Sequence, residues 1–212
     1  MRRVPLIGFI FFLQACTSSQ NSVFRTFQYA LKASSDVTVS DEQVLRTPYA
    51  SAYLRVGDLP RAFVILGYLD AGEEKWISND KAMVSLKNGR LIKTLGLSDN
   101  VVELTQQQHD PLADSAHLHE GEQWVRILRW TDENQPRSVE LFSTFTRGNN
   151  EVLTLLGQRI ICQVWIEHVR ALTTAWDNIF WIELDTGRVR QSRQAIGPYS
   201  PFIEFTLLKP TL

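Results

Sequence analysis

The chain lacks the motifs that mark several common classes of enzyme and nucleic-acid-binding protein. It contains no G-x-S-x-G nucleophile turn and no phosphate-binding G-x-x-x-x-G-K-S/T loop, so the sequence gives no support to those hydrolase and nucleotide-binding folds. Its 22 basic and 23 acidic side chains nearly balance, and no long run of one sign is present. That balance argues against nucleic acid as a partner. No cofactor is predicted.

Cysteine is also scarce, and internal repetition is missing. The only cysteines are Cys16 and Cys162. If Cys16 is modified, a single thiol remains and no intramolecular disulfide can form. Cys162 lies in an apolar run with Ile160 and Ile161, which predicts a buried, inert thiol. No repeat of constant period is found, which disfavours a propeller.

The first sixteen residues have the pattern of an export signal. Two arginines follow Met1, residues 4–13 are almost entirely apolar, and a small residue directly precedes Cys16. Residues 1–15 therefore predict a signal peptide that is too short to span a bilayer as a mature helix. With Leu13 three positions before it, Cys16 fits the lipobox of bacterial lipoproteins and is the predicted lipid anchor. The alternative is an ordinary secretory leader.

An acylated Cys16 would hold the mature protein on a membrane. Several acyl chains, at about 0.8 kcal/mol per buried methylene, give stable anchoring. Thr17 stands where Asp retains lipoproteins at the inner membrane, so the predicted location is the periplasmic face of the outer membrane of a Gram-negative cell. Residues 16–21 are predicted to form a lipidated tether, and residues 22–212 a single β-rich periplasmic domain.

One amphipathic helix is predicted at the start of this domain, over about residues 22–33. Val23, Phe24, Phe27, Ala30 and Leu31 recur at helical spacing and form one apolar stripe. We expect the stripe to pack on the domain, because a single Arg25 and Lys32 give the helix little cationic surface for binding a membrane.

From Ala50 onward the apolar period becomes that of strands, with turn signals about every ten residues. The strongest is Asn88-Gly89, whose residues tolerate the positive φ of a type I′ hairpin turn. Further turns are expected at Gln135-Pro136, Gly148–Asn150 and Asp185–Gly187, and a long loop that is either functional or loosely ordered is expected to begin at Gln106. Short links imply an antiparallel meander of about a dozen strands. The fold class is therefore all-β, curled into a barrel-like or sandwich domain, with one N-terminal helix.

Two tryptophans on successive strands are candidate contact residues. On the strand around Cys162, alternation predicts Cys162 and Val164 toward the core, with Trp165 on the opposite face. On the next strand Phe180 would face inward and Trp181 outward. If these strands pair as a hairpin, Trp165 and Trp181 share a surface for a protein partner or a glycan. The favoured alternative is that a loop or the N-terminal helix covers both rings.

Titratable clusters give weaker candidates. His117 and His119, near Glu120, raise the question of a zinc site, but a solvated loop is favoured over metal binding. Glu167 and His168 are neighbours on a strand, so they face opposite ways and cannot act on one substrate atom.

A short basic run follows the expected turn at Asp185–Gly187. Arg188 and Arg190 would share a strand face and could bind an acidic polysaccharide. Pairing with acidic residues such as Glu183 is the favoured alternative. A slip of one residue after the turn would exchange the faces. No catalytic, metal or cofactor residue is therefore assigned.

Several segments resemble one family of lipoproteins. They are Asn88–Leu91, Asp110–Leu112, Cys162–Trp165, Trp176–Trp181, Asp185–Gln194 and Leu208–Pro210. The resemblance is to the YjbF/GfcB family, encoded with group 4 capsule and exopolysaccharide secretion systems, and it runs from the lipobox to the end of the chain. It implies an all-β outer-membrane lipoprotein that serves polysaccharide export or assembly. It implies no catalytic residue.

Two functions from different classes follow. The first is a noncatalytic lipoprotein, not an enzyme, that contacts outer-membrane or periplasmic secretion proteins, or the polysaccharide itself. The second is a carrier whose curled sheet encloses an apolar ligand. A glycan hydrolase or deacetylase is a weaker third alternative, because it would need a convergent carboxylate pair or a metal site. A filled interior would favour the first function, and an empty apolar interior the second.

Overall fold

The computed structural model describes residues 35–106 and 108–211. Its elements, in chain order, are α2 (Asp41–Arg46), β1 (Ser51–Val56), β2 (Ala62–Asp70), β3 (Glu73–Ser78), β4 (Met83–Lys87), β5 (Arg90–Leu95), β6 (Val101–Gln106), the 3₁₀ segment η1 (Pro111–His117), β7 (Gln123–Asp132), β8 (Gln135–Leu155), β9 (Gln158–Arg170), β10 (Ala175–Glu183), β11 (Val189–Ala195) and β12 (Phe202–Lys209). The predicted leader, the Cys16 anchor, the tether and the helix at residues 22–33 lie outside the described residues.

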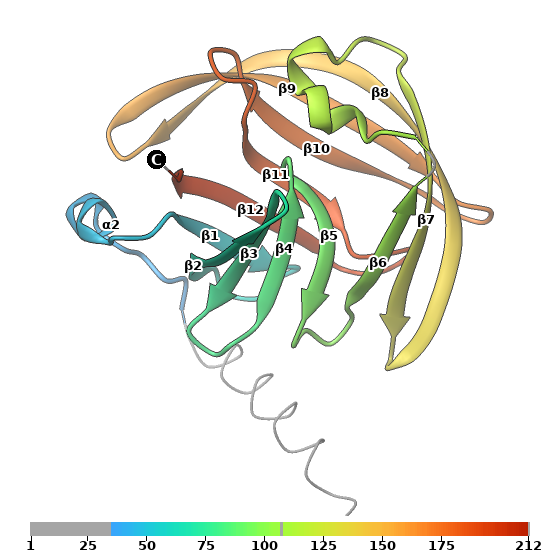
Figure 1. Ribbon diagram of the computed structural model, residues 1–212, viewed down its shortest axis with the longest axis horizontal. Coiled ribbons are helices and arrows are strands. Elements are labelled where there is room, and N and C mark those ends of the chain that lie inside the picture. The colour runs from blue at the N-terminus through green and yellow to red at the C-terminus, as the bar shows by residue number, and fades with distance from the viewer. Residues whose placement is uncertain (1–34, 107, 212) are drawn as a thin grey trace, which may run out of the picture.

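All twelve strands form one antiparallel sheet that curls into a nearly closed barrel shape (Figure 1). The spatial order runs from β5 back to β1, continues with β12, and then runs back to β6. β1 and β12 are therefore neighbours in the middle of the sheet, whereas β5 and β6 are its two edges. The all-β, barrel-like prediction is confirmed, and the barrel-like alternative is chosen over the sandwich.

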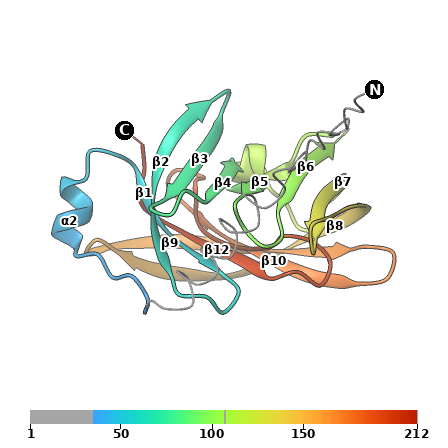
Figure 2. The same ribbon diagram turned by 90° about the horizontal axis from the view of Figure 1, so that it is seen from below.

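Local sequence explains the short helix and the tightest turns. Asn88 and Gly89 adopt φ values of 51° and 79° and join β4 to β5, which confirms the predicted hairpin. The turn expected at Gln135-Pro136 lies two residues earlier, at Glu133 and Asn134, where both φ angles are positive. Helix α2 begins with a capping box, in which the Ser40 side chain accepts from the Gln43 backbone N–H. It lies outside the sheet, beside β1 and β12 (Figure 2).

One predicted turn is wrong. Gly148–Asn150 does not end a strand, because β8 continues from Gln135 to Leu155 with a register shift between Arg147 and Asn150. The glycine and asparagines form a β-bulge, which bends the strand while the pairing with β9 resumes on its far side. The result is a long β8–β9 hairpin that curls over one end of the barrel shape (Figure 1).

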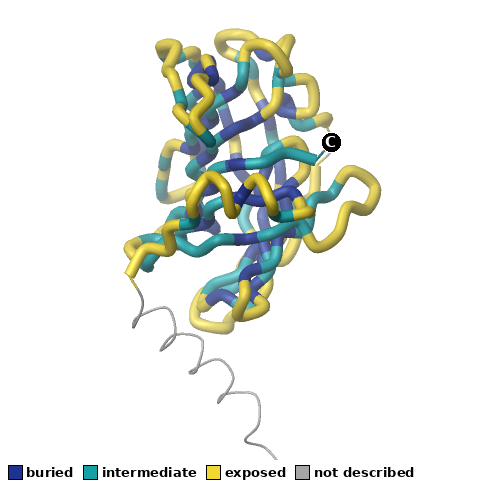
Figure 3. The backbone as a smooth tube through the Cα atoms, turned by 90° about the vertical axis from the view of Figure 1, so that its left-hand side faces the viewer, coloured by how far each residue is buried: buried dark blue, intermediate teal, exposed yellow. Residues whose placement is uncertain are grey.

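The core fills the inside of the curled sheet, and exposed residues gather in the links between strands (Figure 3). One cluster includes Trp76, Leu128 and Phe205, and a second includes Trp124, Phe145, Trp165 and Phe180. Among the described residues, no helix combines the length and the apolar character that crossing a membrane requires.

Candidate functional site

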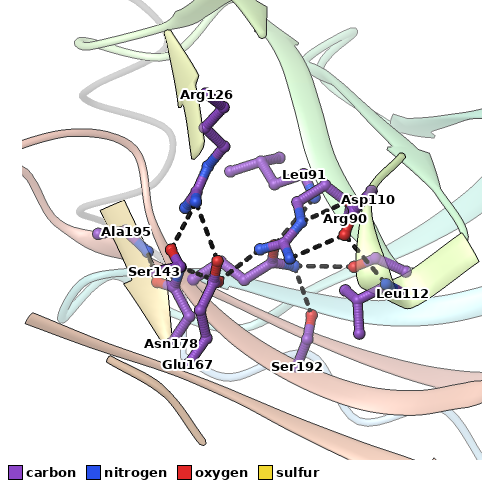
Figure 4. A network of polar contacts seen from close by, with 12 residues as sticks. Arg90, Leu91, Asp110, Leu112, Arg126, Ser143, Glu167, Asn178, Ser192 and Ala195 are labelled. Atoms are coloured by element: carbon purple, nitrogen blue, oxygen red, sulfur yellow. Dashed lines mark hydrogen bonds and ion pairs between the residues drawn. The ribbon is translucent and has the colours of Figure 1, made fainter. Parts of the chain in front are cut away.

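The interior holds two buried arginines around one carboxylate (Figure 4). Arg90 on β5, Arg126 on β7 and Glu167 on β9 are 3%, 4% and 0% exposed. Arg90 Nη1 donates to Glu167 Oε2 at 2.6 Å, and Arg126 Nη1 lies 3.0 Å from Glu167 Oε1. Asn178 on β10 donates its Nδ2 proton to Oε2 at 2.8 Å. Glu167 therefore links β9 to its neighbour β10 and to β5 and β7, which lie farther away in the sequence.

A second carboxylate balances the charge of this cluster. Asp110, just before η1, accepts from Arg90 Nε at 2.8 Å and from Arg90 Nη2 at 3.2 Å. Asp110 also accepts from the Leu112 backbone N–H at 3.0 Å. The two guanidinium groups lie over the Trp124 ring, at 4.6 Å and 4.2 Å from its centroid. The two positive charges are thus matched by two negative charges.

The pKa shifts follow from this pairing. Burial acts to raise the pKa of Glu167, but Arg126, Arg90 and the Asn178 hydrogen bond outweigh it and lower that pKa to about 2. Burial lowers the pKa of Arg126 to about 10, against the attraction of Glu167. All three groups are charged near neutral pH, and none has a pKa suited to proton transfer there. We interpret the cluster as structural.

The interior is also filled. Beside the cluster lies a cavity of about 20 Å³, bounded by Arg90, Leu104, Trp176 and their neighbours. That volume accommodates about one water molecule. A second cavity, beside β1, is also about 20 Å³, and both are too small for an apolar ligand.

The segment η1 closes one end of the barrel shape. Leu112 and Leu118 are buried against Trp124 and Phe145 in the second core cluster. The Ser115 hydroxyl donates to the Gly187 carbonyl in the β10–β11 link. The solvated loop predicted around His117 and His119 is confirmed for most of residues 113–122, which are exposed. It is wrong at Leu118, because tertiary packing buries a leucine that has no strand or helix period in the sequence.

Three open clefts surround η1. One of about 350 Å³ lies between η1, the Asn88-Gly89 turn and the β10–β11 link, and it reaches the core residues Leu86, Phe205 and Leu207. One of about 490 Å³ lies between the edge strands β5 and β6. The third, of about 380 Å³, lies between η1 and strands β8 to β10. We call it the Trp165 cleft, and its defining residues are Leu118, Glu120, Arg147, Gln163, Trp165 and Glu183.

The structure separates the two candidate tryptophans. Trp165 pairs with Phe180 and is 5% exposed inside the barrel, whereas Trp181 pairs with Val164 on the outer face. The shared surface is therefore wrong, and the favoured alternative of coverage by a loop is confirmed for Trp165, which packs in one cluster with Leu112 and Leu118. Trp181 does face outward as predicted, and its Nε1 donates to Glu151 Oε2 at 2.7 Å. Trp165 instead lies at the base of the cleft named after it.

The prediction of which face of β9 points into the barrel is wrong. Cys162 and Val164 are buried, but on the face opposite to the one that carries Trp165 and Glu167. Because β9 is apolar on both faces, alternation alone does not choose the inner one. Cys162 is fully buried, which confirms the predicted burial, and burial raises its thiol pKa to about 11, which disfavours the reactive thiolate.

The histidines are not gathered into a cluster. His117 and His119 are exposed, and their nearest acidic groups are Asp114 and Glu122, at 2.8 Å and 3.6 Å. The hydrogen bond that the Asp114 carboxylate accepts from the His117 ring raises the pKa of His117. His168 lies on the face opposite to Glu167, as predicted, and its Nδ1 is 2.7 Å from Asp177 Oδ1.

The arginines at the start of β11 lie in different environments. Arg188 precedes the strand and is exposed, so the predicted shared face with Arg190 is wrong. Arg190 is buried at the β10–β11 bulge, where its Nε lies 4.0 Å from Glu183 Oε2, which agrees with the favoured pairing. The β-bulge opposite Trp181 and Ile182 explains why Arg188 and Arg190 do not share a face, and it lies where a register slip of one residue was expected.

Sequence reasoning missed the cluster of Arg90, Arg126 and Glu167. The only local signal was a charged residue placed among apolar ones on each strand. Glu167 is 77 positions from Arg90, and no sequence period connects them.

Comparisons with known proteins agree with this architecture. Residues 24–208 match the family described as "Group 4 capsule polysaccharide lipoprotein gfcB, YjbF". The chain is 41% identical to the lipoprotein GfcB of Escherichia coli K12, over 99% of both chains. It is 31% identical to the lipoprotein YjbF of the same organism, over 99% of this chain and 98% of that one.

A solved structure shows the same fold. The crystal structure of the hypothetical lipoprotein YmcC from Escherichia coli K12 superposes with a TM-score of 0.78. The match has 38% sequence identity and covers 92% of this chain and all of that chain. With a family match over most of its length and relatives above 30% identity, the chain belongs to the YjbF family of group 4 capsule polysaccharide lipoproteins.

Proposed function

We propose that the protein is a noncatalytic outer-membrane lipoprotein that takes part in capsule or exopolysaccharide secretion through contacts made by its surface. The observation that supports this most is the contrast between a filled interior, whose charges are paired with one another, and the open clefts around η1. Any ligand or partner would meet the clefts and the outer face. The family description supplies the capsule pathway.

The same observation weakens the alternative of an apolar carrier. A carrier of a lipid-like molecule needs an enclosed apolar volume of several hundred Å³. The interior cavity of about 20 Å³ is far smaller and is lined by Arg90 and Arg126 among others. The three larger spaces are open clefts with polar groups along their walls.

Lipidation at Cys16 is the second part of the proposal. Anchoring confines a protein to the membrane plane, so a weak contact with a membrane-embedded partner is strengthened by a high effective concentration. Small surface patches then suffice for assembly. Under this proposal the clefts and the outward-facing Trp181 contact the secretion proteins or the polysaccharide.

A complementation experiment tests both parts. In cells whose own copy is deleted, we expect surface polysaccharide to fall, wild type to restore it, and Cys16→Ser to fail because the unacylated chain leaves the membrane fraction or keeps its leader. Cys162→Ala is the matched control, since it removes a cysteine without touching the anchor. Normal polysaccharide in the deletion strain would refute the role in secretion. Wild type found free in the periplasm would refute the anchor.

The partners can be sought in the same strain. We expect crosslinking of the acylated wild type in intact cells to recover outer-membrane or periplasmic secretion proteins, and Cys16→Ser to recover them less well at equal expression. Equal recovery by the two proteins would show that the anchor does not promote assembly.

A further inference from the structure

The Trp165 cleft combines an apolar floor with polar groups on its walls. Trp165, Leu118 and Ile182 form the floor, and each is largely buried, so their positions are fixed by the second core cluster. Leu184 stands at the wall and is 51% exposed. The volume of about 380 Å³ is within the range of small-ligand sites.

Arg147 is held at the wall of this cleft by contacts that do not use its outer nitrogens. Its Nε donates to Gln163 Oε1 at 2.6 Å, and its backbone N–H donates to Glu120 Oε2 at 2.6 Å. Gln163 is 5% exposed and is itself fixed, because its Nε2 donates to the Gly148 carbonyl at 2.6 Å. Among the described residues, no partner hydrogen-bonds the Nη1 and Nη2 atoms of Arg147. The β8 bulge thus presents a preorganised donor.

The remaining polar groups of the cleft are mainly acceptors. Glu120 and Glu183 both line it, and the Thr186 hydroxyl fixes one Glu183 oxygen at 2.6 Å. Arg147 and Arg190, whose Nε lies 4.0 Å from Glu183 Oε2, balance these two carboxylates. A ligand that carries its own carboxylate would therefore find no excess of positive charge here. Hydroxyl groups suit this lining, since each one can donate to a carboxylate and accept from arginine.

We propose that the Trp165 cleft binds a short stretch of uncharged sugar residues of the exported polysaccharide, an inference that rests on the proposed function. The apolar C–H face of a pyranose ring would pack on the floor and on Leu184. Its hydroxyls would accept from Arg147 Nη1 and Nη2 and donate to Glu120 and Glu183. Because the charges of the cleft are balanced, acidic sugar residues gain no advantage there over uncharged ones.

The test is direct binding to the acylated full-length protein in nanodiscs. The probes are oligosaccharides released by mild acid from the cell's own surface polysaccharide and divided by anion exchange into an uncharged and an acidic pool. We expect the uncharged pool to bind wild type, and Arg147→Ala to weaken binding by about tenfold or more, because each hydrogen bond to a charged group contributes strongly. Arg147→Lys, which keeps the charge but loses the fork, should weaken binding as well.

Arg159→Ala is the matched control, because Arg159 is an exposed arginine on the same β8–β9 hairpin and does not line the cleft. It should bind like wild type, and thermal melts should show that all variants are folded. Binding of only the acidic pool, binding of neither pool, or wild-type affinity in Arg147→Ala would each overturn the inference. The deletion strain tests the proposed function separately, so a loss of polysaccharide there without glycan binding here would refute the site alone.

Discussion

The inside of the barrel and the rim around η1 use the same side chains in opposite ways. Inside the barrel, Arg90 pairs with Glu167 and Asp110. Arg126 pairs with Glu167 and donates a hydrogen bond to Ser143. At the rim, Arg147 is fixed only through Nε and its backbone, and Glu120 through a single backbone contact. Buried ions need partners because desolvation is costly, whereas rim ions remain hydrated. The interior should therefore determine stability, and the rim should determine binding.

The largest expected effect comes from removing the central charge of the interior. Glu167→Gln should destabilise the fold by about 5 kcal/mol, because both buried arginines lose their shared carboxylate. Urea denaturation followed by circular dichroism measures this. The rim control is Glu120→Gln, for which we expect a change within about 0.5 kcal/mol. Equal losses in the two variants would remove the distinction between interior and rim.

The same substitution, Trp to Ala, can be compared inside the barrel at Trp165 and on its outer face at Trp181. Trp165→Ala should cost about 4 kcal/mol, since it leaves a cavity in the second core cluster. Trp181→Ala, on the outer face, should cost about 1 kcal/mol or less and leave a folded protein. If Trp181 contacts a partner, that variant should lower polysaccharide secretion at normal protein levels. A folded, stable Trp165→Ala would show that the burial of this ring contributes little.

Acid should weaken the ion pairs of the interior as the pH falls below 4.5. The folded pKa of Glu167 lies below its unfolded value of 4.5, at about 2, so its stabilising effect is present above pH 4.5 and is lost as the pH falls toward 2. The loss for this group should be about 3 kcal/mol. Denaturation curves between pH 6 and pH 2 check this. The slope should be shallower in Glu167→Gln, and an unchanged slope would contradict the assignment.

The smallest effect is expected at the exposed histidines. The double substitution His117→Ala and His119→Ala removes side chains that are mostly solvated, so stability should change by no more than about 0.5 kcal/mol and secretion should be normal. Loss of secretion in the folded double variant, together with zinc-dependent recovery of chelated wild type, would instead support a metal site.

The sequence predicted the sheet well and the inside of the sheet poorly. Asn88-Gly89 and the alternating segments locate most strands, because turn chemistry and period are local properties. The side of β9 that faces inward depends on Glu167 meeting Arg90 and Arg126, which are supplied by distant strands. The Gly148 bulge resembles a turn for the same reason, since the pairing beyond it is formed with β9.

The pairing of β1 with β12 has a consequence for the order of folding. Residues 51–56 meet residues 203–209, so the seam in the middle of the sheet joins the two ends of the described chain. Closing so long a loop is slow compared with forming hairpins. We expect the hairpins of β2 to β5 and of β6 to β11 to form early as separate sheets. Only when the last strand has emerged can it join them, which makes β12 the element that commits the chain to one fold.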